Sequence, residues 1–152
     1  MEQLMLWQQG SLYINQIQNQ VSGIVTWQLN NAQQAFGILI CNNGWLNQHA
    51  DVAERFLKAL DEAQNYILNN PERAKAIAQN QLNYTSSYID AVWPQHDFSL
   101  SLDQSLIIAL QDEAQWMVSN HLTNQMQIPN FTNYIYTRGL SEVNPQLVTL
   151  VT

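Results

Sequence analysis

An apolar stripe with the 3.6-residue period of an α-helix runs through residues 51–69, and it limits the possible folds more than any other feature. The opposite face carries charged side chains, and Asp51 and Glu54 each precede a basic residue by four positions, which favours a helix. We therefore predict a long amphipathic helix that needs a sheet or other helices against its stripe. The stripe consists of Val52, Phe56, Leu60, Ala63 and Ile67.

The charge of the chain is concentrated around this helix. Residues 49–77 hold nine of the 17 charged residues and four of the five basic ones. Their spacing places them on a solvated helix face, so we interpret them as surface charge rather than as acid–base machinery. The net charge of −7 excludes a nucleic-acid partner, because phosphates require a basic surface that five Lys and Arg cannot supply.

No pattern in the sequence predicts catalysis, a metal site or a cofactor. The histidines at 49, 96 and 121 lack a His-Glu-x-x-His motif and companion cysteines, so no zinc site is expected. The chain has neither a Gly-x-Ser-x-Gly turn nor a glycine-rich phosphate loop. Cys41 lies in an apolar run, which predicts a buried and inert thiol. We expect a protein that is not an enzyme.

Two apolar, β-branched runs before residue 42 predict strands at Val21–Leu29 and Ala35–Cys41. A short amphipathic helix is expected before them at residues 11–20, and the remaining elements are helices. An Asn70-Pro71 pair predicts a helix start that leads to about residue 80, and Thr85 or Ser86 is expected to begin the next helix.

Three further elements complete the chain. Ser101 and Gln104 have the spacing of a capping box in front of a long apolar stripe, which predicts a helix reaching about residue 120. A last helix is expected after Asn130 and to be closed by Gly139, with a turn or short helix at the end. Two strands cannot cover this many amphipathic helices with a sheet, so part of the fold is expected to be missing.

Aromatic residues beside amides are the candidate ligand contacts. Trp7 and Gln8, together with Trp27, offer a stacking face next to hydrogen-bonding groups that suit a small polar solute. The tryptophans at 45, 93 and 116 have core-like spacing and are interpreted as packing residues.

Three stretches, in order, resemble the C-terminal half of solute-binding proteins of ABC importers of the nitrate, sulfonate and taurine type, including relatives that bind thiamine precursors. They are GILICNNGWLNQHADVAERFLKALDEAQNYILNNPERAKAIA, FSLSLDQSLIIALQDEAQWMVSNHLT and PNFTNYIYTRGLSEVNPQLV, beginning at residues 37, 98 and 129. Family members usually carry a glycine at the end of the helix that is predicted here to reach about residue 120. This chain has Asn120-His121 at that point, so Asn120 is expected to adopt the left-handed conformation.

The resemblance implies a helix-rich α/β fold, the C-terminal portion of a type II periplasmic-binding-protein architecture with one or two strands and five or six helices. Residues 1–34 would form the end of lobe two and the crossover, and residues 35–152 the returning strand and C-terminal helices of lobe one. The implied partners are a small-molecule solute and, through the full-length protein, an ABC permease. The family is periplasmic or extracytoplasmic; the first residues lack a signal-peptide pattern, which predicts a cytoplasmic location for the chain as given.

A second reading stays open beside this one. The chain can instead be a truncated or stand-alone helical interaction protein without ligand-binding activity, which forms homo-oligomers or exchanges strands through its uncovered faces.

Overall fold

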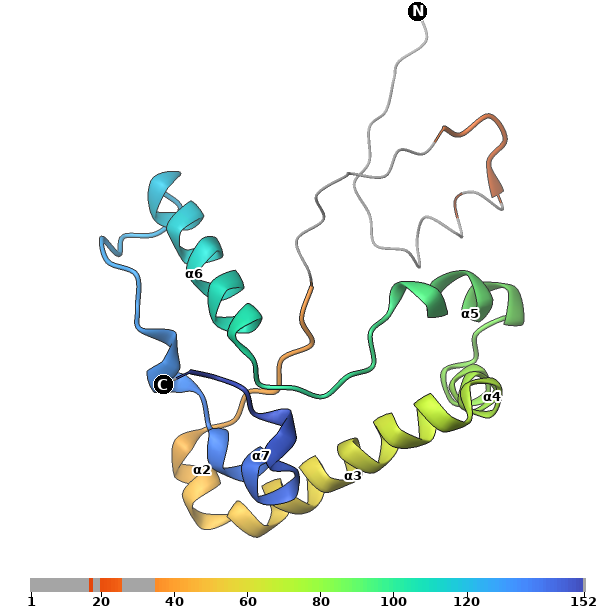
Figure 1. Cartoon of the computed structure of the whole chain (residues 1–152). Helices are drawn as coiled ribbons and strands as arrows, with labels where there is room; N and C mark the ends of the chain where they lie inside the picture. Colours follow the sequence, from red (N-terminus) through yellow and green to blue (C-terminus); the bar gives the residue numbers. More distant parts are fainter. Residues whose placement is uncertain (1–16, 18–19, 26–34, 152) are drawn as a thin grey trace, which may run out of the picture. The chain divides into compact units, whose positions relative to one another are not determined.

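The computed structural model describes residues 17, 20–25 and 35–151, and the regular secondary structure in this part of the chain is almost entirely helical (Figure 1). It contains six α-helices and three short 3₁₀ helices, which confirms the helix-rich class. The α-helices are α2 (Asn43–Gln48), α3 (Ala50–Asn69), α4 (Pro71–Leu82), α5 (Ser86–Val92), α6 (Gln104–Ser119) and α7 (Thr137–Val143). The 3₁₀ helices are η1 (Trp93–Gln95), η2 (Phe131–Tyr134) and η3 (Pro145–Leu147).

The two predicted strands are not formed where the structure describes them. Residues 21–25 form a turn, with Gly23 at φ 81°, while the rest of Val21–Leu29 lies outside the described residues. Ala35–Cys41 has no regular secondary structure, and Cys41 is exposed rather than buried. An apolar run supplies only a preference for extended backbone, and a strand forms when a neighbour completes its hydrogen bonds. Most of the helix predicted at residues 11–20 lies outside the described residues. The two of its residues that are described, Ile17 and Gln20, are helical.

Helix α3 confirms the strongest prediction, and Pro71 separates it from α4 as expected. Proline is favourable at the first helical position, because its missing N–H would have no partner there. The acid–base pair in the first turns of α3 is formed, with Arg55 Nη2 3.1 Å from Asp51 Oδ2. The stripe, however, is only partly covered, since Val52 is 36% and Phe56 51% exposed.

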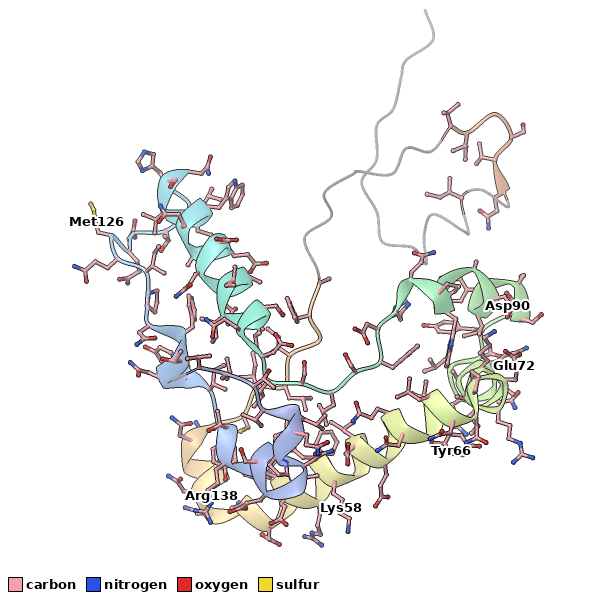
Figure 2. All side chains as sticks on the ribbon, in the orientation of Figure 1. Lys58, Tyr66, Glu72, Asp90, Met126 and Arg138 are labelled. Atoms are coloured by element: carbon pink, nitrogen blue, oxygen red, sulfur yellow. The ribbon has the colours of Figure 1, made fainter. Side chains whose placement is uncertain are left out.

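The described residues fall into two compact units, and the first combines residues 17 and 20–25 with Asn69–Phe98. Its small core contains Ala74, Ile89 and Val92. Lys75 connects α4 to α5. Its ammonium lies 3.0 Å from Glu72 Oε1 of α4 and 3.5 Å from Asp90 Oδ1 of α5. Figure 2 labels both carboxylates on these neighbouring helices. The pKa of Lys75 is raised, mainly by its hydrogen bond to Glu72.

The second unit combines residues 35–68 and 99–151, and its core is formed by Leu46, Leu106, Ile107 and Leu140. Its β pairing is a single parallel bridge between Leu102 and Val148 within the described residues. The amide of Leu102 donates to Leu147 O at 2.8 Å, and Leu102 O accepts from Thr149 N at 2.9 Å. These bonds hold the segment before α6 against the end of the chain.

Gly139 does not close the last helix, contrary to the prediction, but lies buried inside α7. A Cβ at this position would come within 2.8 Å of Tyr136 Cε1 and 3.0 Å of Leu57 Cδ1. The glycine therefore permits α7 to approach α3 closely. The region after Asn130, expected to be one helix, is instead η2 followed by a break and α7, and Asn130 caps η2 by accepting from Thr132 N at 3.2 Å.

Helix α6 lies where it was predicted, but different residues cap its two ends. Its N-cap is Asp103 rather than Ser101, and Asp103 Oδ1 accepts from Ser105 N at 2.8 Å. Ser101 instead donates its hydroxyl to Asp103 Oδ2 at 3.0 Å. At the other end, His121 rather than Asn120 adopts the left-handed conformation, with φ 56°, while Asn120 has φ −98°. The left-handed residue that ends the helix is therefore one position later than predicted.

Replacing Asp103 tests this cap. Hydrogen bonds from Ser105 and Ser101 lower the pKa of Asp103 below its usual 3.8, so its stabilising contribution is complete above that value and is lost as the pH falls through the folded pKa. We expect Asp103→Ala to lower the free energy of unfolding by about 0.5–2 kcal/mol at pH 7. Asp103→Asn, which still caps, should retain most of the stability but lose the acid sensitivity. Urea unfolding at pH 7 and pH 3 measures both, and identical pH profiles for the parent and Asp103→Asn would contradict the assignment.

Candidate functional site

The three residues predicted to contact ligand, Trp7, Gln8 and Trp27, lie outside the described residues. Their role therefore stays a prediction from the sequence. Three polar or hollow surfaces within the described residues can be compared with the predicted ligand chemistry, and all three lie in the second unit.

The first is a polar cluster around Gln64, the buried polar residue of α3. Gln64 Nε2 donates to Asp61 Oδ1 at 2.7 Å, and Gln64 Oε1 accepts from the amide of Leu100 at 2.6 Å. Asn144 Nδ2 also lies 3.5 Å from Asp61 Oδ1. The cluster thus connects three segments that are distant in the sequence, and because its buried groups bond to one another, its function is to hold them together.

Sequence reasoning missed this cluster. Gln64 follows Leu60 by four residues, which places it on the apolar side of α3 and is the signal that could have revealed its burial. The partners could not be predicted, because Leu100 is 36 residues from Gln64 and Asn144 is 83 residues from Asp61.

The second surface is a groove of about 600 Å³ between α6 and the segment that precedes η2. Three side-chain amides offer hydrogen bonds there, but Gln115 donates to Ser119 Oγ at 3.0 Å and the Asn130 oxygen accepts from Thr132. The only charged group in the lining is a carboxylate, so the groove does not complement an anionic solute. The lining consists of Gln111, Asp112, Gln115, Ile128, Pro129 and Asn130.

The third surface is a hollow of about 520 Å³ lined by Asp112, Glu113, Trp116 and Met117. Trp116 is 60% exposed, which contradicts its interpretation as a packing residue. Two carboxylates beside an indole repel anions, so this hollow is also unsuited to nitrate or a sulfonate. Within the described residues, neither hollow has the positive charge that would attract nitrate or a sulfonate.

The described part of the chain offers no cluster of three or more His, Cys, Asp or Glu side chains that could hold a metal ion. Among the same residues, no helix combines the length and hydropathy needed to cross a bilayer.

Comparison with known proteins places the decisive similarity in the first half of the chain. Residues 11–74 match the family model described as NMT1/THI5 like. The match covers 64 of the 152 residues, which is less than half of the chain. The match includes α2, α3 and the start of α4, and it confirms over these residues the resemblance to nitrate, sulfonate, taurine and thiamine-precursor solute-binding proteins. No curated protein and no solved structure matches the chain.

The NMT1/THI5-like segment contains Trp27 but not Trp7 or Gln8. It also contains α2, which the sequence analysis did not predict. Asn42 caps this helix by accepting from the amides of Gly44 at 2.8 Å and Trp45 at 3.3 Å. The indole of Trp45 stacks on the ring of His49, with 4.9 Å between ring centroids. The helix turns the chain from the apolar run into α3.

Proposed function

We propose that the chain is a portion of the substrate-binding component of an ABC importer, and that it binds a small solute without catalysing a reaction. The match of residues 11–74 to the NMT1/THI5-like family carries this proposal. The partly exposed stripe of α3 supports it as well, because Phe56 and its neighbours are suited to packing on a sheet that the described residues do not provide.

In the proposed arrangement, residues 1–34 form the end of lobe two and the crossover, and residues 35–152 supply the returning strand and helices of lobe one of a type II fold. A solute that contacts both lobes favours the closed state, and the closed full-length protein then docks on its permease outside the cytoplasm. The solute is nitrate, a sulfonate such as taurine, or a thiamine precursor. This chain supplies only part of the cleft, so its own affinity should be weak.

In this proposal Trp7, Gln8 and Trp27 contact the solute. The indoles provide flat apolar faces, and the Gln8 amide both donates and accepts hydrogen bonds. Trp116 is less suited to an anionic solute, because Asp112 and Glu113 line the same hollow.

Replacing Trp27 tests the assignment. Titration of tryptophan fluorescence with nitrate, taurine, an alkanesulfonate and a pyrimidine, at constant ionic strength, should give a saturable change with at least one solute. We expect Trp27→Leu to weaken the affinity for that solute roughly tenfold or more, since stacking on an aromatic ring is lost. Trp116→Leu is the matched control and should leave the affinity unchanged. Equal loss in both variants would remove Trp27 from the site.

A second candidate function, a helical interaction protein without solute binding, is favoured by the exposed apolar side chains of α6. Ile108 is 50%, Trp116 60% and Met117 42% exposed. Exposed apolar surface of this kind is typical of protein–protein contacts. The same fluorescence titration distinguishes the two functions, because an interaction protein should give no saturable response to any of these solutes.

A further inference from the structure

Asn43 is followed by Gly44, and no other asparagine in the sequence precedes a glycine. An asparagine in this position can lose its side-chain amide without an enzyme. The backbone nitrogen of the next residue attacks the asparagine Cγ, and glycine permits this approach best because it has no Cβ. Asn43 is exposed, so water reaches the side chain that would react.

The first turn of α2 (Figure 1) holds the attacking nitrogen away from this reaction. Gly44 N donates to Asn42 Oδ1 at 2.8 Å, and Trp45 N donates to the same oxygen at 3.3 Å. Leu46 N closes the turn by donating to Asn42 O at 2.9 Å. An amide that donates in this way keeps its proton, and a helical ψ of about −42° directs it away from the preceding side chain.

We propose that Asn43 is a site of spontaneous deamidation and that the Asn42 cap of α2 controls its rate. When the turn opens, Gly44 N bonds to Asn43 Cγ, the Cγ–Nδ2 bond breaks, and the proton of Gly44 N leaves with Nδ2 as ammonia. Water then opens the resulting succinimide to aspartate or isoaspartate, so no oxidant or cofactor is consumed. The reaction does not depend on solute binding, and a failed solute titration leaves it standing.

The two products act differently on α2. Aspartate leaves the backbone unchanged and adds one negative charge to the chain. Isoaspartate adds a methylene to the backbone between residues 43 and 44, which displaces Gly44 N from Asn42 Oδ1 and breaks the cap. Because α2 carries Leu46, which is buried in the core of the second unit, the isoaspartate form also loosens that core.

Incubation of the full chain at mildly alkaline pH, followed by peptide mapping with mass spectrometry, measures the conversion of Asn43. The urea-unfolded chain should convert Asn43 before any other asparagine, and the folded chain should convert it more slowly. We expect Asn42→Ala to raise the rate in the folded chain roughly fivefold, which corresponds to the loss of about 1 kcal/mol from one N-cap. Asn42→Ser still caps the helix, so its rate should equal that of the parent.

Asn130→Ala is the matched control, because Asn130 caps η2 in the same unit by accepting from Thr132 N at 3.2 Å. It should leave the rate at Asn43 unchanged, with equal helix content in all variants by circular dichroism. Equal acceleration in Asn42→Ala and Asn130→Ala would overturn the proposal, because general unfolding would then control the rate. So would a parental rate in Asn42→Ala, or equal rates in the folded and the urea-unfolded parent, since the cap would then give no protection.

Discussion

Replacing Ile107 by alanine is expected to lower the free energy of unfolding by about 2–5 kcal/mol. Ile107 is 1% exposed and lies in the first turns of α6, where it belongs to the small core of the second unit. Removing its side chain leaves a cavity in a core that has three other described members, Leu46, Leu106 and Leu140. In a core this small, the loss should be a large fraction of the total stability.

Ile108 provides the matched control, since it is the next residue of the same helix and is 50% exposed. Ile108→Ala changes the same chemistry without opening a cavity, and alanine is the better helix former, so we expect a change below about 1 kcal/mol. Urea unfolding followed by circular dichroism measures both variants. Similar losses for the two would mean that α6 does not bury Ile107 as described.

Replacing Gln64 by alanine is expected to lower the free energy of unfolding by about 1–3 kcal/mol. The substitution leaves the amide of Leu100 without its acceptor and removes the donor that lies 2.7 Å from Asp61 Oδ1. Buried groups that lose their partner pay the cost of desolvation without compensation. The effect should be accompanied by faster hydrogen exchange at the amide of Leu100.

Gln81→Ala is the control for this prediction, because Gln81 is an exposed glutamine near the end of α4. We expect its effect to stay within about 0.5 kcal/mol of zero. If Gln64→Ala were equally neutral and Leu100 exchanged at its parental rate, the cluster would not hold the segment before α6 in place.

The helices of this chain could largely be predicted because their signals are local. The stripe from Val52 to Ile67 and the Asn70-Pro71 break depend on residues within a few turns, and the structure has α3 and α4 at those positions. Errors appeared where neighbouring residues compete for one role. Asp103 rather than Ser101 became the cap of α6, and both residues belong to the same hydrogen-bonded group.

Features that depend on distant contacts could not be predicted from local pattern. Ala35–Cys41 has the composition of a strand, but strand formation requires a partner, and the described residues supply none. Gly139 was read as a helix end, whereas its function is to admit the side chains of Tyr136 and Leu57. The predicted strand and the actual glycine contact both depend on what packs against them.

The family and the class of solute were predicted from the resemblance. The family similarity could be predicted from the motif beginning at Gly37, and the match over residues 11–74 confirms it. The solute contacts Trp7, Gln8 and Trp27 rested on residue type alone. The spacing of the tryptophans could not distinguish buried from exposed ones, because tryptophan occurs in both environments. Trp116, which was predicted to pack, is exposed.

Calorimetric titration of the unmodified chain with nitrate, taurine, an alkanesulfonate and a thiamine-precursor pyrimidine tests solute binding most directly. At matched ionic strength, we expect saturable heat with one class of solute and weak affinity, because only part of a two-lobed cleft is present. Heats equal to those of dilution for every solute, from protein that unfolds cooperatively, would contradict the assignment of this chain to solute binding.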